Sequence, residues 1–207
     1  MSAPAILHEP WERVEEQHIA THFGVWMFLA SEVLFFAALL MFYAVSRVSH
    51  SAGFDAGAQH ADLLLGTVNT LLLLTSSMTL TVAERASKAG LVPLARGAIT
   101  ATLALGLGFL AVKGFEYRHD LAEQMFPGPD FPLRAPGASL YWAFYWVATG
   151  IHAVHLTVGL ALIGRLLLVP RAELARHWIT VEGVTLYWHL VDIVWLFLFP
   201  LLYLVGR

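Results

Sequence analysis

The stretch YWHLVDIVWLFLFPLLYL, residues 187–204, is apolar and aromatic except for two ionisable side chains, His189 and Asp192. A helix that spans a membrane needs about 20 predominantly apolar residues, so this stretch has the composition of such a helix and nearly its length. In lipid, an ionisable side chain costs free energy unless a polar partner meets it. The stretch therefore predicts a membrane helix whose histidine and aspartate face other helices.

The whole chain has the composition of a membrane protein. Of its 207 residues, 58% are hydrophobic and 13% are charged, and the mean hydropathy is +0.67. A soluble domain of this length does not need so much apolar surface. We predict an all-α polytopic membrane protein, in which a polar N-terminal cytoplasmic segment, 1–21, precedes a transmembrane domain of five helices, 22–207. The predicted spans cover residues 23–45, 62–83, 94–115, 139–169 and 179–205.

Cysteine and charge content exclude several classes of function. The chain has no cysteine, which excludes disulfides, iron–sulfur clusters and thiolate chemistry. Its formal net charge of −3 is spread along the chain without a basic stripe, which argues against a nucleic-acid partner.

Lysine and arginine near the ends of the spans predict the orientation, because short cytoplasmic loops carry an excess of both. The excess favours an N-terminus in the cytoplasm and a C-terminus outside. The cytoplasmic side then holds Arg13, Arg85, Lys88, Arg96, Arg165, Arg171 and Arg176, and the outer side holds Arg47, Lys113, Arg118, Arg134 and Arg207.

Glu32 lies inside the first predicted span, roughly 14 Å along the helix from Phe23 and so near the middle of the membrane. A carboxyl group there costs about 2.5–3.5 kcal/mol on the scale of insertion measurements, so it should face the bundle and have a partner. Two interpretations stay open. Glu32 is either a protonated hydrogen-bond donor that fixes helix packing, or a group that holds and passes protons.

Three ionisable side chains of the last span share one side of the helix. Glu182, His189 and Asp192 fall within a sector of roughly 80° at 100° per residue. Polar groups on a facing helix can therefore satisfy His189 and Asp192.

His152 and His155, in VATGIHAVHLTVG, are three residues apart and share one face of the fourth span. We expect one of them to hydrogen-bond across to Glu32 or Asp192. An alternative is a metal or haem site, since two histidines with a carboxylate bind zinc or iron, and histidines on facing helices can hold a haem. The hydrogen-bonded interpretation is favoured, because each imidazole has a polar neighbour within reach of its face.

Small, hydroxyl-bearing and aromatic residues predict how the spans pack. Helices in lipid approach one another through small residues and hydrogen bonds. The residues expected in such contacts are the stripe Gly97, Ala101, Ala104 and Gly108, and the pairs Asn69 with Ser76 and Thr70 with Ser77. The residues expected in an aromatic belt at the outer membrane surface are Tyr141, Trp142, Tyr145, Trp146 and Tyr203.

Five motifs, taken in order, resemble subunit III of the haem–copper terminal oxidases. They are FGVWMFLASEVLFF, NTLLLLTSS, GFEY, VATGIHAVHLTVG and YWHLVDIVWLFLFPLLYL. The resemblance covers the chain from His22 onward. The longer form of that family has seven helices, and this sequence is similar to its last five, as in the shorter bacterial form.

The resemblance implies a non-redox accessory subunit in a bacterial plasma membrane. Haems and copper would belong to partner subunits I and II, with no catalytic residue and no metal site on this chain. The subunit would pack on subunit I, sustain proton uptake and keep the active site durable during turnover. The buried ionisable or proton-linked positions that match the family's motifs are Glu32, Glu116, His152, His155, Glu182, His189 and Asp192.

The resemblance also implies bound phospholipid, because family members hold lipids in the membrane. By charge and depth, Arg165, Arg171 and His177 are the candidates for lipid headgroups, against the simpler interpretation of ordinary cytoplasmic charge. Within the resemblance, the glutamate of ASE implies a cytochrome c oxidase over a quinol oxidase, because quinol-oxidase relatives often resemble an aspartate variant at that position. The rival functions are an accessory subunit of a nitric oxide reductase system and a membrane electron carrier with a bis-histidine haem.

Overall fold

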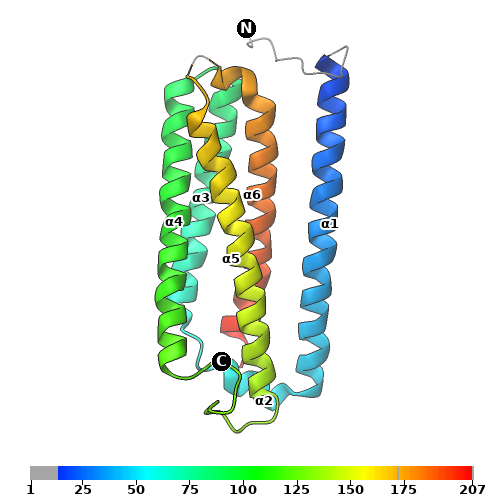
Figure 1. Cartoon of the computed structure of the whole chain (residues 1–207), viewed down its shortest axis with the longest axis vertical. Coiled ribbons are helices and arrows are strands. Elements are labelled where there is room, and N and C mark those ends of the chain that lie inside the picture. The colour runs from blue at the N-terminus through cyan, green and yellow to red at the C-terminus, as the bar shows by residue number, and fades with distance from the viewer. Residues whose placement is uncertain (1–13, 172, 207) are drawn as a thin grey trace.

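The computed structural model describes residues 14–171 and 173–206, which form helices and connecting segments without a strand (Figure 1). The long helices are α1 (Val14–Ser49), α3 (Leu63–Lys88), α4 (Val92–Ala122), α5 (Ala138–Leu168) and α6 (Trp178–Phe199). The short ones are α2 (Ser51–Ala58), the 3₁₀ helix η1 (Leu174–His177) and the π-helix η2 (Pro200–Leu204), which continues α6.

Within the described residues, five helical segments are long and apolar enough to cross a membrane. They are Ile19–Ser49, Leu63–Lys88, Val92–Ala122, Ala138–Leu168 and Trp178–Leu204. The predicted all-α class and the predicted number of spans are therefore confirmed.

Helices extend beyond the apolar runs from which the spans were predicted. α1 begins at Val14 rather than at Phe23, and α4 continues to Ala122 rather than ending at Phe115. The short α2 forms within the connection between the first two spans. Hydropathy marks only the part of a helix that lies in lipid, whereas its backbone hydrogen bonds can continue into the headgroup layer. Residues 1–13 lie outside the described part of the chain.

Local sequence explains where α3 begins and ends. The carboxylate of Asp62 accepts hydrogen bonds from the backbone N–H groups of Leu64 (2.9 Å) and Leu65 (3.1 Å), which caps the first turn. Gly90 follows α3 with φ of +74°, a left-handed conformation that glycine adopts without strain. Pro93 then stands in the first turn of α4, where its missing N–H is not needed. This tight connection places α3 and α4 side by side.

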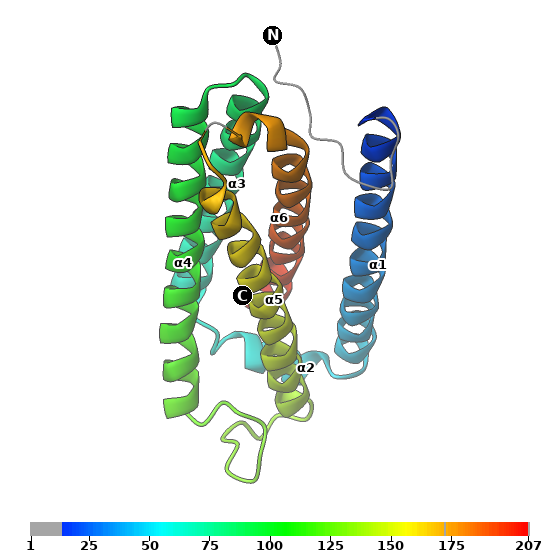
Figure 2. The same ribbon diagram turned by 45° about the horizontal axis from the view of Figure 1, so that its top comes forward.

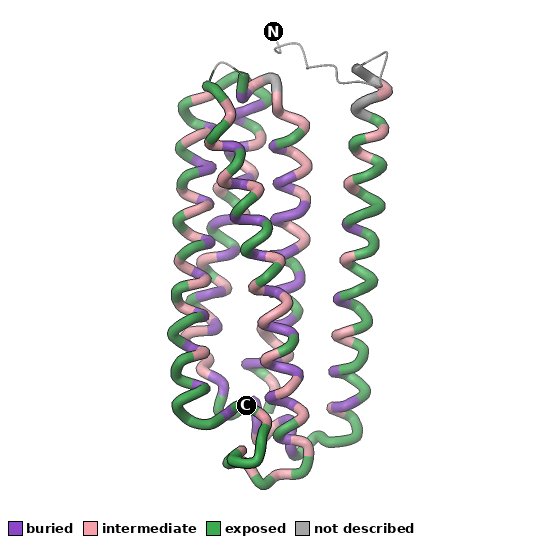
Figure 3. The backbone as a smooth tube through the Cα atoms, in the orientation of Figure 1, coloured by how far each residue is buried: buried purple, intermediate pink, exposed green. Residues whose placement is uncertain are grey.

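The helices α3, α4, α5 and α6 form one group, and α1 stands at its side in both views (Figures 1 and 2). α1 contacts α6 and the short α2. Only 11% of the most apolar part of α1 is buried, against 50% for α6 with η2, and Figure 3 shows exposed residues along most of α1. This exposed apolar surface is suited to lipid or to another membrane chain.

Trp188 is the central packing residue of the helix group. Its indole lies against two glycines, Gly106 of α4 and Gly159 of α5. A Cβ atom would meet the indole ring at 3.0 Å from Gly106 and at 2.8 Å from Gly159. The three helices can therefore approach at this level only because both positions lack a side chain.

The packing predicted from small and hydroxyl-bearing residues is confirmed for α3 and wrong for two of the four residues of the α4 stripe. The hydroxyl groups of Thr70 and Ser76 each accept a hydrogen bond from a tryptophan indole of α6, both at 3.0 Å. On α4, however, Gly97 and Ala104 are exposed, and no atom lies within 4 Å of a Cβ built at Gly97. Small residues are equally suited to a lipid-facing surface, so their spacing alone does not identify the contact face.

Candidate functional site

Ionisable side chains of the described spans gather in three places. We name them the α1–α5 pair, the α3–α6 row and the α4 cluster. The α1–α5 pair is Glu32 with His155; the α3–α6 row is Ser77, Thr81, Glu84, Lys88, Glu182, His189 and Asp192; the α4 cluster is Lys113, Glu116, Asp120, Tyr145 and Tyr203.

The α1–α5 pair confirms the hydrogen bond predicted across two spans. Oε2 of Glu32 lies 2.9 Å from Nε2 of His155, and Nδ1 of the same ring lies 2.9 Å from the carbonyl oxygen of Ile151. A carbonyl can only accept, so Nδ1 carries a proton and donates to it. Nε2 then either accepts a proton from a neutral carboxyl group or donates one to a carboxylate. The pair can thus hold one transferable proton, and the geometry accommodates both positions of that proton.

The two histidines of the HxxH motif diverge rather than converge. His152 is buried, and its ring lies against Phe109 and Trp195, with centroid separations of 5.6 and 5.1 Å. Neither of its ring nitrogens has a hydrogen-bond partner among the described residues. His155 points instead toward Glu32. Across the described ranges, no group of three or more histidine, aspartate and glutamate side chains is placed to hold a metal ion.

The α3–α6 row begins with the pair from the opening stretch, His189 and Asp192. Nδ1 of His189 lies 2.6 Å from the hydroxyl of Ser77, and its Nε2 lies 3.3 Å from the hydroxyl of Thr81. Oδ2 of Asp192 lies 4.0 Å from Nδ1 of His189. The facing helix α3 therefore satisfies the histidine, as the sequence predicted, through hydroxyl groups.

The other end of the α3–α6 row is an ion-pair network around Lys88. The Lys88 ammonium group lies 2.8 Å from Oε1 of Glu84 and 3.3 Å from Oε1 of Glu182. His22 of α1 approaches the other oxygen of Glu182 at 3.9 Å. The three ionisable side chains predicted on one side of α6 thus all face α3. Glu182 lies in the second turn of α6, and α6 begins at the same end of the bundle as α1 (Figure 1).

Lys113, at the centre of the α4 cluster, corrects the sequence analysis, which assigned it to the outer membrane surface. Its side chain is only 2% exposed, and its ammonium group lies 3.1 Å from Oε2 of Glu116. It donates hydrogen bonds to the hydroxyl groups of Tyr203 (2.7 Å) and Tyr145 (3.0 Å). Burial of a lysine requires such partners, because an isolated ammonium group is very costly in an apolar interior.

Two carboxyl groups complete the α4 cluster. Oε1 of Glu116 accepts a hydrogen bond from Tyr203 at 2.6 Å and lies within hydrogen-bond distance of Tyr145. Oδ2 of Asp120 also lies 2.8 Å from the Tyr145 hydroxyl. The cluster joins α4, α5 and η2.

The sequence contained a signal for this cluster. Lys113, Glu116 and Asp120 have the spacing of one helix face, which was hidden because the predicted span ended at Phe115. The aromatic belt expected at the outer membrane surface is wrong for four of its five residues, because their side chains are buried inside the protein. These four are Tyr141, Trp142, Tyr145 and Tyr203, and only Trp146 of the five is partly exposed.

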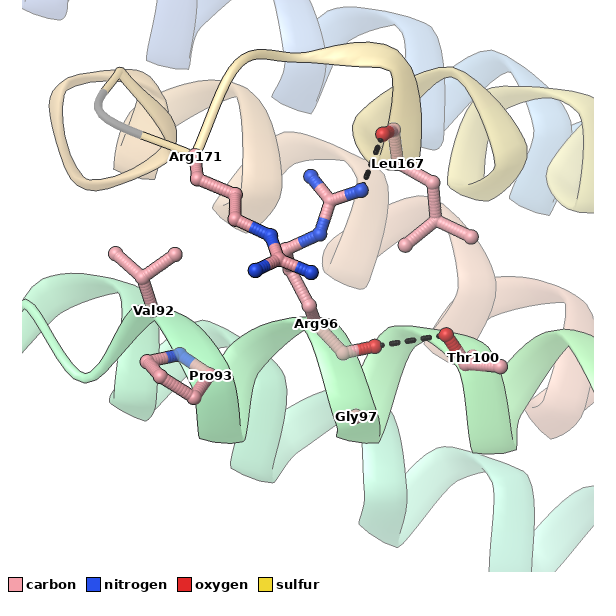
Figure 4. A pocket seen from close by; sticks show the side chains of 7 residues that line it. All are labelled: Val92, Pro93, Arg96, Gly97, Thr100, Leu167 and Arg171. Atoms are coloured by element: carbon pink, nitrogen blue, oxygen red, sulfur yellow. Dashed lines mark hydrogen bonds between the residues drawn. The ribbon is translucent and has the colours of Figure 1, made fainter.

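The three candidates for lipid headgroups divide between two cavities. Arg165 and His177 line a cavity of about 500 Å³ between α5 and α6. Arg171 lines a different cavity, which it shares with Arg96 of α4 (Figure 4). The three candidates, which the sequence analysis chose by charge and depth, therefore do not line one cavity.

Comparison with known proteins agrees with the arrangement of spans and motifs. The family model described as cytochrome c oxidase subunit III matches residues 13–207 of the chain. The chain belongs to the cytochrome c oxidase subunit III family. Among its relatives, cytochrome c oxidase subunit 3 of Bacillus subtilis is 32% identical over 186 residues, which cover 88% of this chain and 85% of that protein.

Two further relatives show the range of this family. Cytochrome c oxidase subunit 3 of Synechocystis is 33% identical over 192 residues, covering 88% of this chain and 75% of that protein. Cytochrome bo(3) ubiquinol oxidase subunit 3 of Pseudomonas aeruginosa is 30% identical over 192 residues, covering 90% and 85%. The relatives are thus named as subunits both of cytochrome c oxidases and of a ubiquinol oxidase. This member of the subunit III family is an accessory subunit of a haem–copper terminal oxidase complex, and it is a multi-pass membrane protein that assembles with other oxidase subunits.

Proposed function

We propose that this subunit packs on oxidase subunit I and sustains proton uptake and active-site durability during turnover, with the α1–α5 pair as a proton-linked group. The observation that carries the proposal is the separation of 2.9 Å between Glu32 and His155, whose side chains are 19% and 20% exposed within membrane spans. A carboxyl group and an imidazole at this distance can share one proton through their hydrogen bond. The pair would act as an accessory store of a proton rather than as an essential relay.

The haems and copper of the complex belong, in this proposal, to subunits I and II, and this chain carries no catalytic, redox or metal-binding residue. Two observations support it. The chain has no cysteine, and the histidines of the HxxH motif point to different neighbours, His155 to a carboxyl group and His152 to aromatic rings. A bis-histidine haem carrier would need histidines that converge on one iron.

The subunit lies, in this proposal, in a bacterial plasma membrane with its N-terminus in the cytoplasm and its C-terminus outside. Lys113 is buried, so it no longer counts among the basic residues at the outer ends of the spans. The excess of lysine and arginine at the proposed cytoplasmic end is then larger. That end holds Arg85 and Lys88 at the close of α3, Arg96 at the start of α4 and Arg165 at the close of α5.

Removal of the subunit tests the main proposal. A complex that lacks it should still transfer electrons and begin to reduce oxygen, while proton uptake slows and activity decays over repeated turnovers. Proton uptake is followed with a pH-sensitive dye during turnover, and adding back the full-length chain is the control. Complete loss of oxygen reduction by a correctly assembled remainder contradicts an accessory role, and a Soret band from the isolated chain contradicts the absence of haem.

The glutamate of the ASE motif, Glu32, favours cytochrome c as the electron donor of the complex. The purified complex should therefore oxidise reduced cytochrome c faster than ubiquinol. The reverse preference would place the complex with the quinol oxidases and leave the role of this subunit unchanged.

Bound phospholipid is the one non-protein component that we propose for this chain. The cavity of about 500 Å³ between α5 and α6 is lined by Arg165, His177 and apolar side chains of both helices. An anionic headgroup could be held by the two cationic or polar side chains, with its acyl chains against the apolar lining. Arg165→Gln should lower the number of phospholipids that co-purify with the complex, as counted by native mass spectrometry.

A further inference from the structure

Tyr145 stands between two carboxyl groups of the α4 cluster, and its hydroxyl group has more partners than its single proton can serve. The hydroxyl oxygen lies 2.8 Å from Oε1 of Glu116 and 2.8 Å from Oδ2 of Asp120, and it accepts a hydrogen bond from Lys113 at 3.0 Å. A phenol has one O–H donor, so it donates to only one of the two carboxyl groups. The other carboxyl group must supply its own proton, because two oxygen atoms without a proton between them repel at this distance.

Glu116 is the carboxyl group that stays ionised. Its Oε1 accepts a hydrogen bond from Tyr203 at 2.6 Å, and its Oε2 lies 3.1 Å from the ammonium group of Lys113. A carboxylate accepts hydrogen bonds and does not donate them, so these contacts fit the charged form. Tyr145 therefore donates to Glu116, and the proton in the contact between Tyr145 and Asp120 belongs to Asp120.

The net charge of the α4 cluster leads to the same assignment. Lys113, Glu116 and Asp120 are buried, and none of the three is more than 2% exposed. One ammonium group and two carboxylates would leave one uncompensated negative charge in the protein interior, which is very costly. Among the described residues no further cation pairs with Asp120, since the neighbouring His119 lies 3.2 Å from Glu123 at the surface. One proton on Asp120 makes the cluster neutral. The titratable groups around Asp120 are Lys113, Glu116, Tyr117 and His119 of α4, Tyr145 of α5 and Tyr203 of η2.

The position of Asp120 in the last turn of α4 also disfavours a negative charge. The backbone N–H of Met125 donates to the carbonyl oxygen of Asp120 at 2.9 Å, and Gln124 has a left-handed conformation with φ of +58°, as in a Schellman motif. The C-terminal end of a helix carries a partial negative charge, which repels a carboxylate but not a neutral carboxyl group. Residues 121–124 are exposed, so water lies within one helical turn of the buried carboxyl group.

We propose that Asp120 binds an exchangeable proton at neutral pH and donates it in a hydrogen bond to Tyr145, which in turn donates to Glu116. When the proton leaves, the O–H bond of Asp120 breaks and water accepts the proton, and the hydroxyl group of Tyr145 can then turn toward the new carboxylate. In the proposed orientation the site lies at the outer end of α4, the end of the bundle where α2 lies (Figure 1). It is separate from the α1–α5 pair and does not depend on the role proposed for that pair.

The test uses the full-length chain in complex with its partner subunits, with isotope-labelled aspartate in this chain alone. Infrared spectroscopy separates the carbonyl band of a neutral carboxyl group from the bands of a carboxylate. At neutral pH, where exposed aspartates are ionised, the wild-type complex should show a labelled carbonyl band that Asp120→Asn lacks. Asp130→Asn is the matched control and should retain this band, because Asp130 is an exposed aspartate of the loop that follows α4. Identical labelled bands in the wild type and in Asp120→Asn would overturn the proposal.

Two further measurements test the hydrogen-bond partner and the exchange of the proton. Tyr145→Phe should shift the Asp120 band to higher frequency, because the acid loses its acceptor. Tyr117→Phe is the control and should leave the band in place, because Tyr117 donates instead to Thr149 at 2.7 Å. Transfer into heavy water should shift the band to lower frequency. A band that Tyr145→Phe leaves unchanged would overturn the hydrogen bond to Tyr145, and a band unchanged in heavy water would overturn the exchange.

Thermal unfolding distinguishes the two carboxyl groups by a different measurement. Asp120→Asn should leave the melting temperature of the complex unchanged, because the amide N–H donates to Tyr145 as the neutral acid does. Glu116→Gln should lower the melting temperature or prevent assembly, because it removes the counter-charge of buried Lys113. Equal losses in the two variants would show that both groups are ionised and would overturn the proposal. A loss confined to Asp120→Asn would assign the proton to Glu116 and would also overturn it.

Discussion

Oε2 of Glu32 on α1 lies 2.9 Å from Nε2 of His155 on α5, and this contact connects the least buried span to the helix group. Most other side chains of α1 are apolar and exposed, and apolar contacts between helices in lipid do little to fix how the helices are oriented. The hydrogen bond between Glu32 and His155 therefore helps to fix the orientation of α1 against α5. In the proposed function the same two groups also hold a transferable proton. The packing role and the proposed proton-holding role then fall on one pair, and substitutions can separate them.

Glu32→Gln should preserve stability and slow proton uptake, because the amide can still donate to Nε2 of His155 but cannot release a proton. Glu32→Ala should lower the free energy of unfolding by about 1–3 kcal/mol, since it leaves the imidazole without its partner. Thermal unfolding of the complex and dye-detected proton uptake measure the two effects.

A double-mutant cycle supplies the control for that pair. Glu32→Ala combined with His155→Ala should cost clearly less than the sum of the two single changes, because both remove the same interaction. Unchanged proton uptake in Glu32→Gln would leave the pair with a packing role only.

Lys113→Met should lower the free energy of unfolding by about 3–5 kcal/mol, because it leaves Glu116 without its buried counter-charge. Lys88→Met is the matched control, since Lys88 is likewise paired, with two carboxylates, but is 38% exposed. The control should cost less than about 1 kcal/mol. Chemical denaturation in mild detergent gives both values. Equal losses for the two lysines would contradict the difference in burial, and adding Glu116→Gln to Lys113→Met should recover part of the stability.

Gly159→Ala should lower the free energy of unfolding by about 1–2 kcal/mol, because its new methyl group must displace the indole of Trp188. Gly97→Ala should be neutral or stabilising by up to about 1 kcal/mol, since that position is open and alanine is the better helix former. Melting temperatures of the two variants show which substitution destabilises the protein more. A larger loss in Gly97→Ala would mean that the small-residue stripe of α4 packs against a partner subunit in the assembled complex.

The hydrogen bond between Ser77 and His189 should show a coupling of about 1 kcal/mol in a double-mutant cycle of Ser77→Ala with His189→Ala. Thr75 offers the matched control, because its exposed hydroxyl donates only to the carbonyl oxygen of Leu71 on its own helix. Thr75→Ala with His189→Ala should be additive. The unfolding free energies of the three single and two double variants decide the result, and coupling in both cycles would point to a general loosening of α3.

Much of the fold followed from the sequence, because the bilayer imposes a length and an apolar composition on every span. The five runs, the all-α class and the costly charges at Glu32, His189 and Asp192 were visible in the residues alone, and the order of motifs indicated the subunit III family. Helix ends were less well predicted, as α4 shows, because hydropathy falls at the edge of the lipid while the helix continues to Ala122.

Partner choice was decided only by the tertiary structure. The sequence offered two histidines and two carboxyl groups, and only the distance between helices paired His155 with Glu32 while His152 packed against aromatic rings. Rotation of a helix about its axis likewise decided that Lys113 is buried. The sequence by itself determined which side chains are too costly to expose to lipid. The packing of the helices determined which partner each of these side chains meets, because partners depend on the rotation of the helices and on the distances between them, and the spacing of residues within one helix encodes neither.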